Sequence, residues 1–284
     1  MSPPDAPARV VTLTTDFGPG SEHVGALHAV IVAHRPDIAR VDFAHDIAPG
    51  EVRWAALQLA RCVSLLPDAV HLAVVDPGVG SDARRPVAVR LRSGGYLVGP
   101  DNGLLEVAVD EAGLSAAVQL DPAAVAGPVS ATFHGRDLFA PAAARLAVGA
   151  ALESLGPAVP AHSITRPRVP DAVVGEGILA AELAGRDAYG NASVLAGIRD
   201  VARAGLAEGD HVSVEVPAGR HPARMTRTFA DAEPGEMLVH IDSHGMVAVA
   251  VNRGSAWDRL EAHAGQLCCI TRSGFGSPDA EARR

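Results

Sequence analysis

A carboxylate and a guanidinium lie near each other at the expected end of a buried strand. Asp76 directly follows the apolar run from His71 to Val75 and precedes a Pro-Gly turn, and Arg84 comes shortly after it. Ligands of open α/β sheets bind where strands end, and a neighbouring guanidinium keeps a carboxylate ionised and oriented. Asp76 and Arg84 therefore form a candidate catalytic pair, although Asp76 could instead cap the turn by accepting backbone amides.

Two further segments have a strand-like run that ends in a polar residue and a glycine. In the first, Asp16 and Phe17 precede Gly18, and in the second, His134 precedes Gly135 ahead of an expected helix. Asp16 could cap a helix or bind both hydroxyls of a ribose, and the Phe17 ring beside it suits a nucleoside. His134 is either a hydrogen-bonded structural residue or a ligand contact at a helix start. We expect the three strand ends to share one cleft.

A short segment of the second half brings a carboxylate, an aromatic ring and an amide together in Asp187, Tyr189 and Asn191. This spacing is typical of a β-turn, in which the aspartate bonds to nearby backbone amides. The same three groups could instead bind a polar ligand. The sequence leaves both interpretations open.

Familiar metal and nucleotide motifs are missing from the sequence. It has no HExxH or comparable zinc spacing, no GxGxxG after the first expected strand and no GxxxxGK[ST]. A hard-cation site remains an alternative, since oxygen and nitrogen ligands occur in several segments. Its members would be Asp16, His45, Asp46, Asp76 and His134. Nothing in their spacing selects this arrangement.

The composition excludes several classes of function. All 24 basic residues are arginine, so a Schiff-base lysine and a phosphate-loop lysine are excluded. The net charge of -9, without a basic run, argues against a nucleic-acid partner. We find no apolar stretch of transmembrane length and no signal-peptide pattern. Cys62, Cys268 and Cys269 lack metal or redox spacing, so we expect reduced cysteines in a cytoplasmic protein.

The first half alternates between strand and helix patterns. Strands are expected at residues 9–15, 39–44, 71–75, 87–91 and 96–99, the last two forming a hairpin. Helices are expected at residues 22–35, 52–66 and 104–112 and around 138–146. A β-α-β-α-β order predicts a mostly parallel, Rossmann-like sheet flanked by helices.

The second half has a different pattern. Four prolines between Pro157 and Pro170 interrupt the periodicity, and short strands follow at residues 177–183, 211–216, 236–241 and 246–251, with one helix at 256–262. This half is predicted to be a small antiparallel β domain, either a sandwich or a barrel. We therefore expect an α/β domain over residues 1–160, a linker over 161–172 and a β domain over 173–284.

Seven segments, taken in order, resemble motifs of the S-adenosyl-L-methionine hydroxide adenosyltransferase family, which is related to the fluorinases and chlorinases. These segments are TTDFG at 14–18, HDIAPG at 45–50, VDPGVGS at 75–81, GPDNGLL at 99–105, TFHGRD at 132–137, DAYGN at 187–191 and NRGSA at 252–256. The resemblance covers nearly the whole chain. It implies an α/β domain, a C-terminal β-barrel and a homotrimer that binds its ligand between neighbouring subunits.

The resemblance also implies a reaction, in which hydroxide displaces methionine from the ribose 5′ carbon of S-adenosyl-L-methionine and gives adenosine. Asp76, Arg84 and His134 occupy the family's catalytic positions. The sulfonium is a good leaving group, so no metal or other cofactor is expected. A carboxylate at position 76 would repel a halide ion, which favours hydrolysis over halogenation.

The same resemblance assigns substrate contacts. Asp16 matches the residue that binds the ribose diol, and Phe17 lies beside it; Asp187 matches the contact to the methionine ammonium. Asn191 and the backbone of Arg253 match adenine contacts, with Tyr189 adjacent, and Ser243 matches the contact to the methionine carboxylate.

Three departures from the family pattern affect these expectations. The loop after Asp76 is one residue longer than usual, so Arg85 is an alternative to Arg84. Residues 192–195 and His244 differ from the family's usual residues, which affects the methionine contacts.

Two other functions stay open: a catalytically idle S-adenosyl-L-methionine or adenosine binding protein, and a metal-dependent nucleoside hydrolase.

Overall fold

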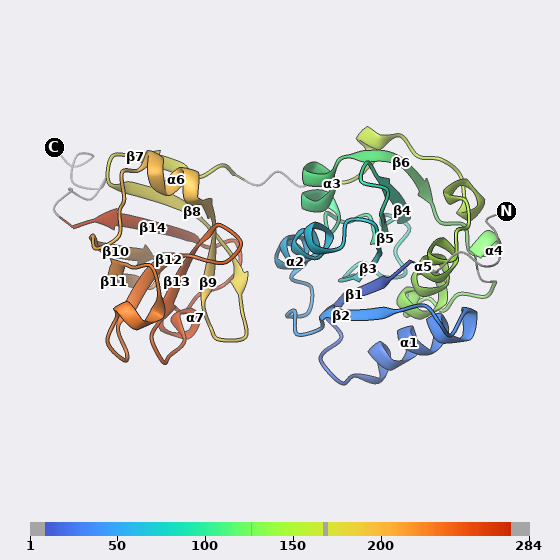
Figure 1. The fold of residues 1–284 in the computed structure, drawn as a ribbon, viewed down its shortest axis with the longest axis horizontal. Coiled ribbons are helices and arrows are strands. Elements are labelled where there is room, and N and C mark those ends of the chain that lie inside the picture. The colour runs from blue at the N-terminus through green and yellow to red at the C-terminus, as the bar shows by residue number, and fades with distance from the viewer. Residues whose placement is uncertain (1–8, 126, 167–169, 274–284) are drawn as a thin grey trace. The chain divides into compact units, whose positions relative to one another are not determined.

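The chain forms two compact units, Met1–Pro167 and Arg168–Arg284, and each is described separately. The computed structural model describes residues 9–125, 127–166 and 170–273, and Figure 1 shows the elements of both units. None of the helices in these ranges is both long and apolar enough to span a bilayer.

The first unit contains a six-stranded sheet in the order β2-β1-β3-β5-β4-β6. Its strands are β1 (Val11–Thr15), β2 (Arg40–Ala44), β3 (Val70–Val74), β4 (Pro86–Leu91), β5 (Tyr96–Pro100) and β6 (Leu114–Gln119). The neighbours from β2 to β5 are parallel, whereas β4 is antiparallel to both β5 and β6. The predicted mostly parallel sheet is therefore confirmed, and the carboxyl ends of β1, β2, β3 and β5 lie at one edge.

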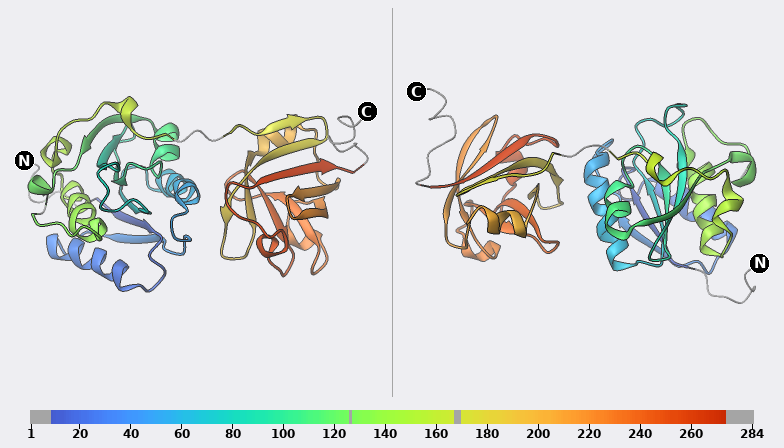
Figure 2. Two further views of the ribbon diagram at one scale, coloured as in Figure 1. Left: turned by 180° about the vertical axis from the view of Figure 1, so that it is seen from behind. Right: turned by 90° about the horizontal axis from the view of Figure 1, so that it is seen from above.

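Helices cover both faces of this sheet, as Figure 2 shows. Helices α1 (Glu22–His34) and α5 (Ala140–Ala147) pack on one face, and α2 (Val52–Leu65) with α3 (Glu106–Ala112) packs on the other. In α1 the buried residues are Val24, Leu27 and Ile31, at the helical spacing expected from the sequence. Short helical segments complete the unit: α4 (Pro122–Val125), the π-helical turn η1 (Gly135–Phe139), and the 3-10 turns η2 (Leu152–Leu155) and η3 (Ala161–Ser163).

One expected feature of the first unit is wrong. The residues before His134 are a loop and not a strand. The Ser130 amide donates to the Asp137 carboxylate at 2.9 Å, and the Thr132 amide donates to the Ser130 hydroxyl at 3.4 Å. Local bonds between side chains and backbone thus replace strand pairing. Strand β6 was also not expected.

The second unit is a β-barrel, which confirms the predicted small β domain. Its sheet order is β14-β10-β11-β12-β13-β9-β8-β7, and β14 also pairs with β8, which closes the ring. All pairings are antiparallel except β11 with β12. The strands are β7 (Val173–Gly175), β8 (Ile178–Arg186), β9 (Ala192–Gly197), β10 (His211–Val216), β11 (Gly219–Met225), β12 (Met237–Ile241), β13 (Met246–Val251) and β14 (Leu267–Arg272).

Over residues 170–273 the barrel also has three short helical segments, α6 (Ile198–Arg203), the 3-10 turn η4 (Phe229–Asp231) and α7 (Ala256–Arg259). The sequence did not indicate β7, β9, β11, β14 or α6. The helix expected over 256–262 is shorter, because Glu261 adopts a left-handed backbone conformation with a φ of 47°.

The proline-rich segment between the halves is partly tied to the first unit. The Gln119 amide donates to the Pro157 carbonyl, and the Val159 amide donates to the Ala117 carbonyl. The Thr165 amide donates to the Asp101 carboxylate at 2.7 Å. Residues 157–165 therefore belong to the first unit, so the chain leaves it later than the proline spacing suggests.

Candidate active site

The carboxyl edge of the first sheet holds one group of candidate residues. Asp16 follows β1 and Asp76 follows β3, and both line a pocket of about 480 Å³. Other residues that line this pocket are Phe17, His23, Pro49, Gly50, Val74, Pro77, Val79, Thr132, Phe133, His134 and Gly135. Because β1 and β3 are parallel, their carboxyl ends place Asp16 and Asp76 in one cleft. Ligands of open α/β sheets bind at this edge. The loop before η1 supplies His134 to the same cleft.

Arg84 joins Asp76 and His134 into one hydrogen-bonded group. Arg84 Nε donates to Asp76 Oδ1 at 3.1 Å, and Arg84 Nη2 lies 2.6 Å from Asp76 Oδ2. The same Nη2 lies 2.8 Å from His134 Nδ1. The side chains of Asp76 and Arg84 are each 5% exposed. Their charges are therefore poorly screened by solvent, which strengthens their attraction.

The environment of this group shifts two pKa values in opposite directions. Burial raises the pKa of the Asp76 carboxyl above its ordinary value, although the Arg84 guanidinium opposes this shift. Burial and the Arg84 charge both lower the pKa of His134. Arg84 Nη1 is buried and has no hydrogen-bond partner among the described residues. The group thus combines a carboxylate of raised basicity, a neutral imidazole and an unused N–H donor.

The adjacent arginine belongs to a different contact. Arg85 Nε donates to Asp101 Oδ2 at 3.0 Å, and its Nη1 donates to the Ser163 hydroxyl at 3.2 Å. Arg85 Nη2 also pairs with the Asp101 carboxylate. Arg85 therefore ties the segment after β5 to η3, whereas Arg84 lies with Asp76 and His134.

The Asp16 side chain is held by the segment that follows β2. The Gly50 amide donates to Asp16 Oδ2 at 3.0 Å, and Gly50 has a φ of 80°, which a glycine adopts without strain. Beside Asp16, the rings of Phe17, His23 and Phe133 pack with centroids 4.9–5.9 Å apart. His23 was not singled out from the sequence, although its place in the first turn of the helix after Asp16 could have indicated it.

The candidate residues of the second unit lie around another pocket of about 480 Å³. Tyr189, Asn191 and Arg253 line it together with four further residues: Phe229, Val251, Asn252 and Gly254. Tyr189 is 81% exposed and Phe229 is 44% exposed. Phe229 was missed in the sequence, where it has no pattern that sets it apart from a core phenylalanine.

Asp187 and Ser243 do not line this second pocket. The Asp187 carboxylate accepts the amides of Tyr189 and Asn191, each at 2.9 Å, and the Asn191 side-chain amide at 2.7 Å. Asp187 therefore stabilises the turn and orients Asn191. Ser243 lies in the turn between β12 and β13, where its hydroxyl is 3.3 Å from His244 Nδ1.

The cation site considered from the sequence does not form. Within residues 9–125, 127–166 and 170–273, no three or more His, Cys, Asp or Glu side chains are grouped so that they could hold a metal ion. His45 instead bonds to Thr15 and Asp42.

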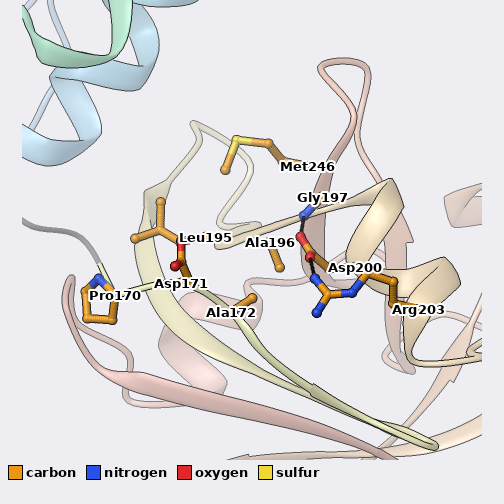
Figure 3. Close-up of a pocket in the computed structure, with 9 residues that line it drawn as sticks. All are labelled: Pro170, Asp171, Ala172, Leu195, Ala196, Gly197, Asp200, Arg203 and Met246. Atoms are coloured by element: carbon orange, nitrogen blue, oxygen red, sulfur yellow. Dashed lines mark hydrogen bonds and ion pairs between the residues drawn. The ribbon is translucent and has the colours of Figure 1, made fainter. Parts of the chain in front are cut away.

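A further hollow of about 550 Å³ lies beside α6 and is shown in Figure 3. Two carboxylates line it, Asp171 and Asp200, and Asp200 accepts the Gly197 amide at 2.9 Å and pairs with Arg203 at 3.2 Å. None of the candidate residues lines it.

Comparisons with known proteins identify the family. Residues 11–156 match the SAM hydroxide adenosyltransferase N-terminal domain, and residues 182–269 match the C-terminal domain of the same family. The chain is 45% identical to the (R)-S-adenosyl-L-methionine hydrolase of Salinispora tropica, over 94% of this chain and 99% of that protein. The fluorinase of Actinopolyspora mzabensis is 25% identical, over 93% of this chain and 97% of its own length.

A solved structure has a similar fold. An uncharacterized conserved protein from Thermotoga maritima superimposes with a TM-score of 0.84 and 33% identity, and the alignment covers 93% of this chain and all of that one. Both family domains thus occur in order, over most of the chain. The chain belongs to the S-adenosyl-L-methionine hydroxide adenosyltransferase family.

Proposed function

We propose that this protein hydrolyses S-adenosyl-L-methionine to adenosine and L-methionine by attack of hydroxide on the ribose 5′ carbon. The observation that carries this proposal is the bonded group of Asp76, Arg84 and His134. Two of its members line the pocket that also contains Asp16. Relatives that are 41–45% identical over most of the chain are named (R)-S-adenosyl-L-methionine hydrolase, which supports the same reaction.

The chemistry needs a base for water and a donor for the developing hydroxide. Bulk water has a pKa of about 15.7, so the proton must leave as the oxygen attacks. Asp76 takes this proton, because its raised pKa makes it a stronger base than an ordinary carboxylate. Arg84 and His134 stabilise the oxygen by donating N–H bonds. A C–O bond forms, the bond between the 5′ carbon and sulfur breaks, and methionine leaves as a neutral thioether.

The proposal includes no metal or other cofactor. Because the leaving sulfur already carries a positive charge, its departure needs neither an acid nor a Lewis acid. Activity should therefore survive treatment with a chelator. Loss of activity on chelation, and its return with added metal, would support a metal-dependent nucleoside hydrolase instead.

Hydrolysis is favoured over halogenation by the charge at position 76. The Asp76 carboxylate is 5% exposed, and a halide ion bound beside it would be repelled through a poorly screening medium. Turnover in the presence of fluoride or chloride should still give adenosine and no halogenated nucleoside.

Substrate contacts follow the family assignments. Asp16 binds the ribose diol, with the Phe17 ring beside it, and the second pocket supplies Tyr189, Asn191 and the backbone of Arg253 to adenine. Asp187 contacts the ammonium group of methionine, and Ser243 contacts its carboxylate.

We further propose a cytoplasmic homotrimer with its ligand between neighbouring subunits. The exposed Tyr189 and Phe229 rings support this assembly, since exposed aromatic side chains are enriched at interfaces.

A product assay tests the reaction. The purified protein is incubated with S-adenosyl-L-methionine, and adenosine and methionine are quantified. Asp76→Ala removes the base and His134→Ala removes an N–H donor to the attacking oxygen. Each should lower turnover by about 100-fold or more, while adenosine binding persists. Saturable binding without turnover in the wild-type protein would favour an idle binding protein.

A further inference from the structure

A chain of hydrogen bonds runs from the surface to the residue before Asp16. We call it the His45 network; its members are Thr15, His45, Asp42 and His28. Thr15 Oγ1 lies 2.8 Å from His45 Nδ1, and His45 Nε2 lies 3.1 Å from Asp42 Oδ1. His28 Nε2 lies 2.9 Å from the same Asp42 oxygen. None of these four residues has a role in the proposed reaction.

For a neutral His45 ring, the chemistry of the groups gives the direction of each bond. An ionised carboxylate only accepts, so His45 carries its proton on Nε2, which donates to Asp42. In the neutral imidazole Nδ1 is then an acceptor, and the Thr15 hydroxyl donates to it. The Thr15 oxygen keeps lone pairs for the Phe17 amide, which lies 3.3 Å away. A single hydroxyl therefore links the imidazole to the backbone after Asp16.

His45 also holds the next amide directly. The Gly18 amide donates to the His45 carbonyl at 2.9 Å. The two amides that follow Asp16 are thus both held by His45, one through Thr15 and one through its own carbonyl. The Asp16 carboxylate is held by Gly50, which lies in the same segment as His45. Residues 45–50 therefore determine where the Asp16 carboxylate lies.

We propose that His45 is a positioning residue that acts through Thr15 to hold the Asp16 carboxylate in place for the ribose diol. Thr15 is fully buried and the His45 side chain is only 9% exposed, so both act on the ligand through Asp16. This inference rests on the part of the proposed function that assigns the ribose contact to Asp16.

Two nucleosides separate positioning from general damage. Adenosine carries the diol, and 2′,3′-dideoxyadenosine lacks it. The ratio of their Kd values, measured on the full-length protein by calorimetry, reports the diol contact alone. The wild-type protein should bind adenosine about tenfold more tightly or better, since hydrogen bonds to a charged group are worth about 1.5–3 kcal/mol. The reference variant Asp16→Ala should bring the ratio close to one.

Thr15→Val is the main variant, because it keeps the shape of the side chain and removes the hydroxyl. It should lower the adenosine preference at least about threefold, as loss of one hydrogen bond does. Thr15→Ser, which keeps the hydroxyl, should retain the wild-type ratio. The matched control is Thr12→Val on the same strand, since Thr12 Oγ1 bonds to His71 Nδ1 at 2.8 Å in a buried position. It should leave the ratio unchanged.

The outcomes are distinguishable. A Thr15→Val protein that keeps the wild-type ratio, or that binds both nucleosides more weakly by the same factor, overturns the positioning role. A wild-type ratio in Asp16→Ala also overturns it, because Asp16 would then not contact the diol. Absence of S-adenosyl-L-methionine turnover in the wild-type protein overturns the proposed reaction alone, since the binding ratio does not depend on turnover.

Discussion

The Nη2 atom of Arg84 lies 2.8 Å from the Nδ1 atom of His134. A guanidinium can only donate hydrogen bonds, so His134 Nδ1 is an acceptor and its ring proton lies on Nε2. The imidazole in this arrangement is neutral, which agrees with the lowering of its pKa by burial and by the Arg84 charge. In the proposed reaction His134 is therefore a hydrogen-bond donor through Nε2, and proton removal from water is left to Asp76.

The protonation state of His134 predicts how activity changes with pH. Its pKa lies below the ordinary value of 6.5, so more than half of the imidazole is neutral at pH 6.5, and protonation becomes dominant only at lower pH. Protonation would place a proton on Nδ1, facing Arg84, and break the contact. We expect kcat/KM to be constant near neutral pH and to fall on the acid side with a midpoint below 6.5. Adenosine release across this range measures it, and a midpoint above 6.5 would contradict the assignment.

The two adjacent arginines should respond differently to the same substitution. Arg84→Lys removes the donor that bridges Asp76 and His134, because a lysine cannot reproduce the forked geometry. We expect turnover to fall by about 100-fold, as for loss of one transition-state donor. Arg85→Lys should keep turnover within about threefold, since it weakens only the contact with Asp101 and Ser163. Turnover is measured by adenosine release. An equal loss of turnover in Arg84→Lys and Arg85→Lys would contradict the different roles that their contacts assign to the two arginines.

The comparison of Arg84 with Arg85 illustrates what the sequence could not decide. The two residues are neighbours with identical side chains. Only the path of the loop before them determines which guanidinium turns toward Asp76. Asp76 and His134 were candidates from the sequence because each is a polar residue beside a proline or glycine, but only the resemblance to the family selected them over turn and structural roles.

The first unit could be predicted because its signals are local. Strands β1 and β3 are short and fully buried, and α1 and α2 have apolar residues at helical spacing. Strand β6 was not predicted, because its sequence has no clear strand pattern. It lies at the edge of the sheet, and only Ala117 and Val118 are buried in it.

The strands of the barrel were harder to predict, because several of them form only through pairing with strands that are distant in the sequence. Strand β11 contains Pro222 and two arginines, which argue against a strand in the sequence. It forms because β10 pairs along its whole length. Strand β14 is specified by pairing with both β8 and β10, a long-range relationship without a local signal.

The glycine at position 80 should be needed for the site geometry. Gly80 lies in the loop between Asp76 and Arg84 and has a φ of 80°. A Cβ there would lie 2.6 Å from the Ala131 carbonyl oxygen, in the loop that leads to His134. Gly80→Ala should therefore push the two loops apart, lower the free energy of unfolding by about 1–2 kcal/mol or more and lower turnover at least about tenfold.

Gly209→Ala is the matched control for this change. Gly209 has a φ of 92° but nothing within 4 Å of an added Cβ. It should cost a similar backbone strain of about 1–2 kcal/mol and leave turnover per folded molecule unchanged. Urea unfolding and the adenosine assay give the two readouts. Wild-type turnover in Gly80→Ala would contradict the prediction, because it would show that the added Cβ does not push the two loops apart.

A buried histidine that lines neither candidate pocket predicts how stability depends on pH. His71 lies on β3, where its Nδ1 is 2.8 Å from the Thr12 hydroxyl and its Nε2 is 3.1 Å from the Leu66 carbonyl. Both contacts are made by a neutral ring, with Thr12 donating and Leu66 accepting. Burial lowers the pKa of His71 from 6.5 to about 4. Between these two values the unfolded chain binds a proton and the folded protein does not, so stability falls as the pH falls.

The expected loss from His71 is about 2 kcal/mol between about pH 7 and pH 5, at about 1.4 kcal/mol per pH unit below 6.5. Urea unfolding at the two pH values measures the wild-type protein, in which other histidines contribute as well. His71→Leu should be less stable at pH 7, because Thr12 and Leu66 lose their partner, but its further loss at pH 5 should be smaller by about 2 kcal/mol. An equal loss in both proteins would mean that His71 is protonated in the folded state at pH 5, and that burial does not hold the ring neutral.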